Sequence, residues 1–484
     1  MFKNYDYLGF HTKYYKNNIN GIKLYKTFKE SMEINQKSNV DVVSIIEFIN
    51  RFYFFGDRTI VDNIYQTPWL SKIEDGIWKS ASLTNTVTEI NSEDEFMKKF
   101  LYLIEKEIKS YIGESKNIGI LLSGGMDSRV VASIVNKLNL EDKISVNVTA
   151  LTWGMANSRD VIYSQQIVNL YGWEFVHFEI TPETLYRNIN IAAQNGCEYS
   201  PVHLHNMYEV ANQDNLDLIL AGSFGDSIGR AEYSGKHASK LKSIGKNIQN
   251  KFQLLNNKLY SQNFKFLQDD LDMYYKKYPK RTKQSQFELE RQIHYMRKEL
   301  NSCMSIIDEK IPLYQVFTSP EIYNFVFNTN SKYRTDKLYY LLLEHIDEKL
   351  LTLPWARTGK PYLCIDDYKV DNYTKNYHNY GKWIKEDLSE KIEKKIFNGN
   401  LESLNIFNMF ALRNMIQYNK KYGTDKLNRV DELLIWLASL SDMLGIYKIE
   451  NRTIGEDGLC SKTYQNILSK MQLLIYLNGI RWLK

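Results

Sequence analysis

The sequence contains few cysteines, and they lie far apart. Cys197, Cys303, Cys364 and Cys460 form no C-x-x-C pair and have no histidine at zinc-finger spacing. This pattern argues against a structural zinc site and against a disulfide framework. We therefore expect a protein of the reducing cytoplasm.

Long apolar runs and a concentrated charge are also missing. No segment approaches the roughly 18 uninterrupted apolar residues of a membrane span, and residues 1–6 lack the basic-then-apolar pattern of a signal peptide. The net charge of +5 is spread along the chain, which gives little support to nucleic acid binding. With 43% apolar and 25% charged residues, the composition is close to the average for soluble globular proteins.

The chain divides into a short lead-in and a large domain. In residues 1–95, short runs of alternating apolar and polar residues are separated by polar turns. This pattern predicts a small α+β region. Apolar residues recur at helical spacing from Ser92 to Lys109, with Ser92 and Glu95 placed as a capping box. We expect residues 96–484 to form one domain, with a sheet core at 117–235 and a mainly helical part at 236–484.

Short aliphatic runs alternate with helical periods in the predicted core. This order is typical of an α/β fold with a parallel, helix-covered sheet. The predicted strands run from Ile118 to Leu122, Ile144 to Leu151, Glu174 to Ile180 and Leu216 to Ala221, and the helices between them from Arg129 to Leu138 and Val161 to Leu170.

A glycine-containing loop joins the first of these strands to a helix. Its sequence is Ser-Gly-Gly-Met-Asp-Ser at 123–128, and the helical run starts at once with Arg129. Two glycines permit a tight turn, the free amides of the helix start point at an anion, and the serine hydroxyls add donors. The loop lacks the spacer residues and the lysine of a Walker A motif. The sequence thus predicts a phosphate-binding loop of a different kind.

The loop resembles the pyrophosphate loop of the N-type ATP pyrophosphatases, and residues 121–129 look most like the synthetase domain of asparagine synthetases. The similarity runs from about residue 50 to 445 and includes an adenosine-binding strand and turn at 151–160. It implies an adenine nucleotide alpha hydrolase-like fold and cleavage of ATP to AMP and pyrophosphate. The implied ATP-binding residues are Leu122, Ser123, Gly124, Gly125, Met126, Asp127, Ser128, Thr152, Gly154, Gly222 and Ser223.

The family carries a second motif, S-G-E-G-x-D, after a later strand, and this chain reads Ala-Gly-Ser-Phe-Gly-Asp at 221–226. Asp226 matches the family's metal-binding aspartate, so the resemblance implies that Asp226 and Asp127 hold Mg²⁺ on the ATP phosphates. Ser223 replaces the acidic substrate contact and Phe224 replaces a glycine. These departures weaken aspartate as the substrate more than they weaken adenylation.

The resemblance also implies catalytic residues near position 360. The stretch Leu-Pro-Trp-Ala-Arg-Thr-Gly-Lys at 353–360 is similar to the family's leucine-proline turn followed by an arginine and a catalytic lysine, which implies roles for Arg357 and Lys360. An earlier motif is degenerate, with Gln315 in the place of an aspartate. The general base stays open: Tyr233 is the first choice, and the alternatives are Glu232, His177, His203 and His205.

Full asparagine synthetases begin with a glutaminase whose nucleophile is the cysteine after the initiator methionine, and here Phe2 occupies that position. We therefore expect residues 1–95 to be a truncated, glutaminase-like region without that chemistry. The predicted function is an ATP-dependent carbon-nitrogen ligase whose partners are a small-molecule or peptide carboxylate, an amine, and an ammonia-supplying or biosynthetic protein. A lasso-peptide or lactam-type cyclase and a catalytically reduced nucleotide-binding scaffold are the alternatives; a thiolation enzyme would need paired cysteines, which we do not find.

Overall fold

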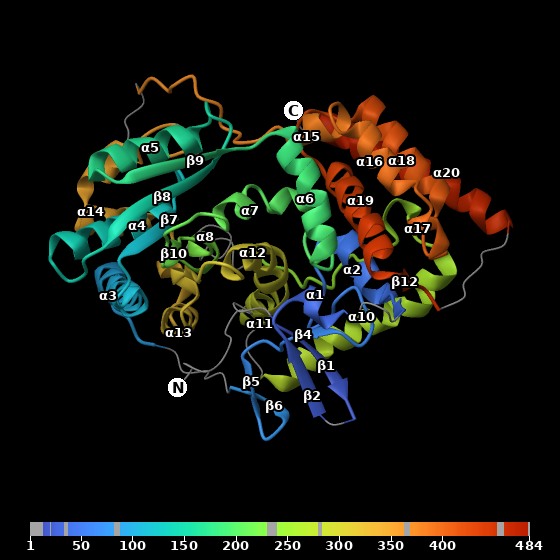
Figure 1. Ribbon diagram of the computed structural model, residues 1–484, viewed down its shortest axis with the longest axis horizontal. Helices are drawn as coiled ribbons and strands as arrows, with labels where there is room; N and C mark the ends of the chain where they lie inside the picture. The colour runs from blue at the N-terminus through green and yellow to red at the C-terminus, as the bar shows by residue number, and fades with distance from the viewer. Residues whose placement is uncertain are drawn as a thin grey trace.

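The computed structural model describes residues 13–19, 21–32, 37–81, 88–229, 240–278, 283–362, 368–452 and 459–482 (Figure 1). A five-stranded sheet in the order β11-β10-β7-β8-β9 organises this structure, and every pair of neighbouring strands is parallel. This confirms the predicted α/β class. The strands are β7 (Asn117–Leu121), β8 (Asn147–Gly154), β9 (Glu174–Glu179), β10 (Leu218–Ala221) and β11 (Leu313–Gln315).

Helices cover both faces of the sheet, as a parallel sheet requires. Ile118, Ile120 and Leu220 belong to one buried cluster with α3 (Glu93–Ile112), α4 (Met126–Leu140) and α14 (Asp336–Ile346). Leu121 and Ile219 belong to another with α6 (Pro182–Gln194), α7 (Met207–Val210) and α12 (Ser305–Asp308). Residues of these strands thus belong alternately to the two clusters, because successive side chains of a strand point to opposite faces of the sheet.

Two sequence predictions about the core need correction. β8 begins at Asn147 and not at Ile144, because Lys143 and Ile144 still bond to the carbonyl of Leu138 at the end of α4. β11 lies in the region expected to be helical, and it forms the sheet edge beside β10. Its three residues are too few to show a strand period.

The helix expected from Ser92 is confirmed as α3, and Ser92 accepts a hydrogen bond from the amide of Glu95 at 3.1 Å. The other half of the predicted capping box differs. The carboxylate of Glu95 accepts from the amide of Asn91, one residue before the cap, at 2.9 Å.

The described part of the lead-in packs against the C-terminal helices. Strands β1 (Tyr14–Asn18), β2 (Gly21–Tyr25) and β4 (Tyr65–Gln66) are antiparallel, and β5 (Ser71–Glu74) pairs with β6 (Ile77–Ser80). Helix α2 (Val42–Arg51) is buried against α19 (Arg429–Tyr447), where Phe48 stacks on Trp436 with ring centroids 4.1 Å apart. β3 (Ser38–Asn39) pairs with β12 (Ile449–Glu450), so the two ends of the described chain share one core.

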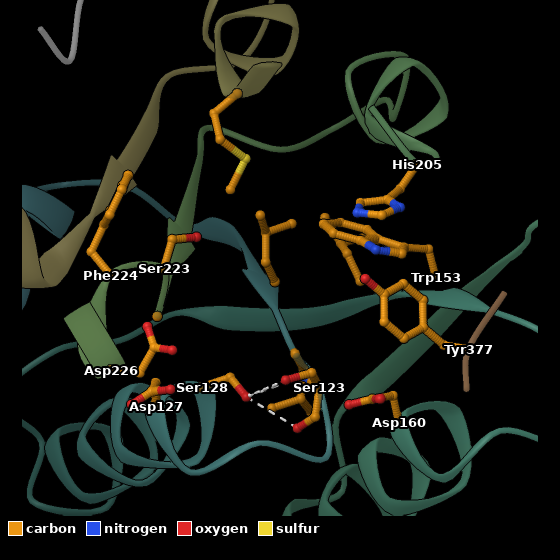
Figure 2. A pocket seen from close by; sticks show the side chains of 15 residues that line it. Ser123, Asp127, Ser128, Trp153, Asp160, His205, Ser223, Phe224, Asp226 and Tyr377 are labelled. Atoms are coloured by element: carbon orange, nitrogen blue, oxygen red, sulfur yellow. Dashed lines mark hydrogen bonds between the residues drawn. The ribbon is translucent and has the colours of Figure 1, made fainter. Parts of the chain in front are cut away.

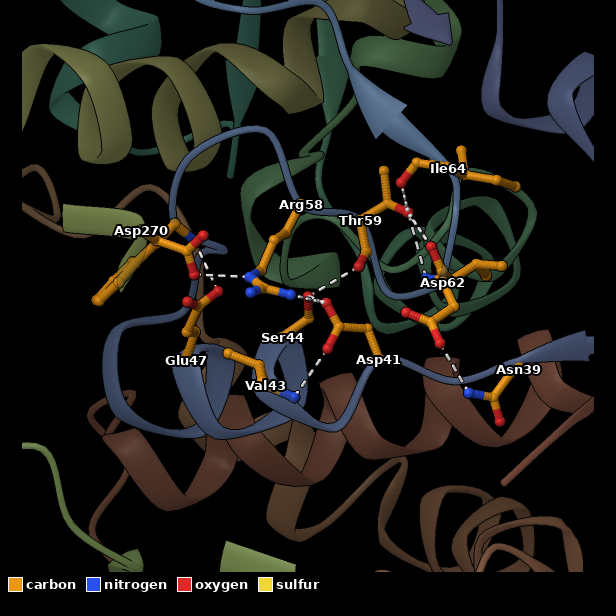
Figure 3. A network of polar contacts seen from close by, with 12 residues as sticks. Asn39, Asp41, Val43, Ser44, Glu47, Arg58, Thr59, Asp62, Ile64 and Asp270 are labelled. Atoms are coloured by element: carbon orange, nitrogen blue, oxygen red, sulfur yellow. Dashed lines mark hydrogen bonds and ion pairs between the residues drawn. The ribbon is translucent and has the colours of Figure 1, made fainter. Parts of the chain in front are cut away.

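An ion-pair network fastens this region to α10 (Asn257–Lys277), as Figure 3 shows. The Arg58 guanidinium lies 2.7 Å from Asp41, the N-cap of α2, and 2.6 Å from Asp270 of α10. Glu47 of α2 accepts from the amide of Phe55 at 2.8 Å, and burial raises the pKa of its carboxyl well above its ordinary value. The network satisfies charges that burial would otherwise disfavour.

The remaining helices are labelled in Figure 1. They are α1 (Phe28–Ser31), α5 (Arg159–Tyr171), α8 (Gly225–Gly229), α11 (Lys283–Glu290), α13 (Pro320–Asn328), α15 (Tyr380–Lys385), α16 (Ser389–Ile396), α17 (Asn400–Ser403), α18 (Met409–Tyr422) and α20 (Leu459–Trp482), with a π-helical stretch at Arg291–Asn301. Within the described chain, no helix combines the length and apolar character needed to cross a bilayer.

Candidate functional site

A cavity of about 340 Å³ lies at the carboxyl ends of β7, β8 and β10. This is the edge where open α/β sheets bind ligands, because the loops that follow the strands converge there. Figure 2 shows polar side chains gathered around the start of α4 and aromatic side chains on the β8 side. The lining residues are Leu121, Leu122, Ser123, Asp127, Ser128, Leu151, Trp153, Asp160, His205, Gly222, Ser223, Phe224, Asp226, Met304 and Tyr377.

The predicted phosphate loop forms one end of this cavity. The Ser128 hydroxyl accepts from the amide of Ser123 at 3.1 Å, and the Ser123 hydroxyl accepts from the amide of Gly125 at 3.2 Å. The two hydroxyl oxygens are themselves 3.1 Å apart. These bonds close the loop back onto the first turn of α4, and both serines line the cavity.

Helix α4 opens onto the cavity without a side-chain cap. Its N-cap is Gly125, which has no side chain to bond the first amides of the helix. Uncapped amides and the positive end of the helix dipole favour an anion at this position. The predicted phosphate site therefore has the backbone geometry that its chemistry requires.

Three glycines in and near the loop leave no room for a side chain, because backbone or side-chain atoms of neighbouring segments lie against them. A β-carbon on Gly222 would meet the amide nitrogen of Ser128 at 2.7 Å, which is backbone that cannot rotate away. A β-carbon on Gly225 would meet the Asp127 carboxylate at 2.6 Å, and one on Gly124 would meet Ala356 at 2.8 Å. The turn after β10 thus packs directly on the first turn of α4.

Three carboxylates surround the phosphate-loop end. Asp127 of α4 and Asp226 of α8 both line the cavity and lie next to each other in Figure 2. Two carboxylates beside a phosphate site are hard oxygen donors that fit Mg²⁺, whose remaining ligands are usually water and phosphate oxygens. No group of three or more histidine, cysteine or acidic side chains with metal-binding geometry occurs in the described residues.

The third carboxylate, Asp160 of α5, accepts a hydrogen bond from the amide of Gly124 at 3.2 Å. Burial raises the pKa of its carboxyl, and the Gly124 amide and the nearby Arg129 oppose that rise. Asp160 therefore fixes the orientation of the loop backbone at the first glycine.

Aromatic rings form the wall on the β8 side. The ring of His205 stacks on Trp153 at 5.9 Å between centroids and on Tyr380 at 6.0 Å, and its Nδ1 lies 2.9 Å from the Tyr380 hydroxyl. Burial, together with the nearby His378 and His203, lowers the pKa of His205 well below its usual 6.5. At pH 7 the His205 ring is consequently uncharged, and it contributes polar nitrogen atoms to a wall that is otherwise aromatic.

The turn after β10 carries the departures from the family motif into the cavity. Ser223 lines the cavity where the family has a carboxylate. Phe224 also lines it, is 5% exposed, and adopts a φ of 69°, the left-handed region that glycine favours. A phenylalanine held there costs about 1–2 kcal/mol of backbone strain, which the packing of its buried ring offsets.

The predicted catalytic turn reaches the phosphate loop through its backbone. The amide of Ala356 donates to the carbonyl of Gly124 at 3.0 Å, and Trp355 pairs with Lys360 as a short bridge. Arg357 is mostly exposed, lies over the Trp355 ring and sits 3.8 Å from Asp336. Neither Arg357 nor Lys360 lines the cavity, so the structure brings their turn, but not their side chains, to the site.

The other predicted residues occupy supporting positions. Thr152 donates its hydroxyl to the carbonyl of Leu122 at 2.8 Å, and Gly154 accepts from His177 at 2.8 Å if the ring nitrogen carries its proton. Met126 points into the core, so only its backbone can contact a ligand. Tyr233 and Glu232 lie outside the described residues.

Two further predicted positions lie away from the cavity. His203 faces Glu432 at 3.1 Å and does not line the cavity. Gln315, at the family's aspartate position, is buried at the end of β11 and donates to Asn301 at 2.6 Å. Its role here is therefore packing and hydrogen bonding inside the protein.

Several lining residues were missed because they come from other parts of the chain. Met304 and Tyr377 have no local sequence signal, whereas Trp153, Asp160 and Phe224 stand inside the motifs and could have been chosen for their position at strand ends. Arg129 was also missed: it directly follows the loop, yet its side chain points back into the protein.

Comparison with known proteins gives one family match. A family model, Asparagine synthase, matches residues 99–308, which include the sheet strands β7 to β10 and the phosphate loop. No curated protein matches the chain. Similar solved structures include a U34-tRNA thiolase from Methanococcus maripaludis (15% identity, 45% of this chain and 78% of that chain, TM-score 0.22) and NMN synthetase from Francisella tularensis (15% identity, 42% and 93%, TM-score 0.20). Residues 99–308 are thus similar to the asparagine synthase family.

Proposed function

We propose that this protein is an ATP-dependent ligase that adenylates a carboxylate, releases pyrophosphate and transfers the acyl group to ammonia or another amine. The observation that carries the proposal is the convergence of the uncapped start of α4, the hydroxyls of Ser123 and Ser128, and two carboxylates in one cavity. The asparagine synthase family match supports an ATP-using synthetase in general.

Binding of ATP would place the phosphates at the loop. The α4 amides and the serine hydroxyls donate to phosphate oxygens, and Asp127 and Asp226 would hold Mg²⁺. The metal, when bound, supplies positive charge that offsets the negative charge developing on pyrophosphate. The aromatic ring of Trp153 offers an apolar surface for the adenine base, which would lie beyond the phosphates.

The proposed chemistry has two steps. A substrate carboxylate oxygen attacks the α-phosphorus, and the bond to pyrophosphate breaks with its electrons leaving on that group. An amine then attacks the acyl carbon, loses a proton to a base, and expels AMP. Among the described residues, His205 is the histidine on the cavity wall, so we propose it as a proton acceptor beside Tyr233.

Lys360 stays our proposed cation for the second step. Its turn is tied to the phosphate loop through the Ala356 amide, which supports a position of this segment near the phosphates that the loop would bind. A cation near the leaving group and the carbonyl oxygen would stabilise the transition state more than the ground state.

The source of the amine separates a ligase from a lactam-type cyclase, in which the amine belongs to the substrate itself. Thiolation receives no support from the described cysteines. Burial raises the pKa of the Cys303 thiol to about 12 and that of Cys197 further, and neither lines the cavity. A thiol that stays protonated is a poor nucleophile.

Exchange of radiolabelled pyrophosphate into ATP, measured across a panel of amino acids, organic acids and peptide carboxylates, tests the proposal. Carboxylate-dependent exchange supports adenylation. Product analysis with and without ammonia then separates ligase from cyclase. ATP binding without exchange on any carboxylate would contradict the proposal and favour a nucleotide-binding scaffold.

A further inference from the structure

The most unusual charged group near the site is Arg129, the first residue after the phosphate-loop motif. Its side chain is fully buried, and its guanidinium donates to backbone carbonyls on two separate segments. One is Gly124 of the phosphate loop, at 3.3 Å. The others belong to the segment ahead of Lys360: Leu350 and Leu353, each at 3.1 Å, and Pro354.

This arrangement differs from an ordinary buried arginine. Arg297 is equally buried, but it pairs with the Asp57 carboxylate at 3.0 Å, and its carbonyl partners lie in the N-terminal region. Around Arg129, the described residues provide carbonyl oxygens and no ion-paired carboxylate. Burial lowers the pKa of Arg129 only to about 10, so it carries its charge at neutral pH.

The same two segments also touch directly. The carbonyl of Gly124 accepts from Ala356 as well as from Arg129, and a β-carbon on Gly124 would meet the Ala356 side chain at 2.8 Å. Carbonyls that lose a buried donor must find water or another donor, which favours separation of the segments. The contact therefore depends on the guanidinium, whose planar fork can reach several acceptors at once.

We propose that Arg129 is a positioning residue that couples the phosphate loop to the turn at 353–360, so that bound triphosphate and Lys360 are held in one geometry. When ATP occupies the loop, the loop backbone becomes ordered by the phosphates. Because Arg129 bonds to both segments, ordering of the loop also restrains the turn that contains Pro354 and Ala356 and ends at Lys360. Arg129 would thus act without contacting the substrate.

The test uses the full chain with Arg129→Lys, which keeps the charge but loses the fork, and Arg297→Lys as the matched control. Three properties are measured: ATP affinity with Mg²⁺ by calorimetry, kcat and KM for formation of the amide product, and the rate at which acetic acid N-hydroxysuccinimide ester acylates Lys360, followed by peptide mass spectrometry with and without ATP. The product measurement rests on the proposed function. The acylation measurement requires only that ATP binds.

We expect Arg129→Lys to bind ATP within about threefold of wild type, to lose about tenfold or more in kcat, and to acylate Lys360 at a rate that ATP no longer changes. Arg297→Lys should melt at a lower temperature while keeping the wild-type kcat and the wild-type effect of ATP on Lys360. A folded Arg129→Lys protein with wild-type kcat and ATP-dependent acylation overturns the proposal, as does an equal loss of kcat in Arg297→Lys.

A second variant keeps the test decisive if Arg129→Lys does not fold. Ala356→Val leaves the buried charge in place and crowds the contact with Gly124. It should show the same loss of coupling between ATP and Lys360 acylation, and wild-type coupling in this variant contradicts the proposal. Absence of the amide product in the wild-type protein would count against the ligase reaction only, because ATP-dependent acylation of Lys360 would still report the coupling.

Discussion

Replacing Gly222 with alanine tests how closely the turn after β10 packs on the phosphate loop. The new β-carbon would lie 2.7 Å from the Ser128 nitrogen and 2.8 Å from the Asp127 carbonyl carbon. These distances are roughly 0.7 Å short of ordinary contact, and both atoms belong to the first turn of α4. The turn and the helix must move apart, at a cost of about 1–3 kcal/mol of stability by analogy with overpacked cores.

The displacement should affect activity more than stability. It separates Asp226 from Asp127, and a misplacement approaching 1 Å in a catalytic site can cost about 100-fold in rate. Urea unfolding gives the stability change, and pyrophosphate exchange at saturating ATP gives the rate. Gly479→Ala is the control, because nothing lies within 4 Å of its β-carbon on α20, and it should be neutral or stabilise by up to about 1 kcal/mol.

The result that would refute this reasoning is specific. If Gly222→Ala retains both wild-type stability and wild-type exchange, the turn does not pack on α4 as described. If it loses stability while exchange per folded molecule is unchanged, the packing is real but the two aspartates do not work together.

Three further predictions concern single side chains. Asp127→Asn and Asp226→Asn should each abolish Mg²⁺-dependent exchange while leaving the melting temperature nearly unchanged, and exchange retained by either variant would remove that aspartate from the metal site. Lys360→Ala should slow formation of the amide product more than pyrophosphate exchange, as measured by product and exchange rates on the same sample; equal losses would place Lys360 in the first step. Buried Glu198 has its pKa raised to about 7 by burial, against an ordinary 4.5, so its contribution to stability is present below pH 4.5 and lost as the pH rises toward 7. This pKa difference corresponds to about 3 kcal/mol in the free energy of unfolding. Measured by urea unfolding, Glu198→Gln should therefore become more stable relative to wild type as the pH rises from 4.5 to 7.5. A stability difference that does not change with pH would contradict the raised pKa of Glu198.

Local sequence was sufficient for the core of the fold and for the phosphate loop. An apolar strand, two glycines and a helix start follow one another at 118–129, and this order is a local signal even though β7 pairs with the distant strands β8 and β10. The capping residue Ser92 was predictable for the same reason. By contrast, β11 was not predictable, because its three residues become a strand only by pairing with β10.

The walls of the cavity required the tertiary structure. Trp153 and Asp160 stand close to the recognised motifs, but His205, Met304 and Tyr377 are brought to the same cavity from three distant segments. Sequence likewise could not show that Gln315 is an internal residue or that the side chains of Arg357 and Lys360 lie outside the cavity lining.

By itself, the sequence determined that a glycine-containing loop of the kind that binds phosphate joins a buried strand to a helix, and that Asp127 and Asp226 follow the ends of two strands. Both features are local, because they depend on backbone conformation and on residue order. Only the tertiary structure decided that the turn at 353–360 lies on the loop and that Arg129 holds the two together. That contact forms across more than two hundred residues, where chain order carries no information about which carbonyls a buried guanidinium will meet.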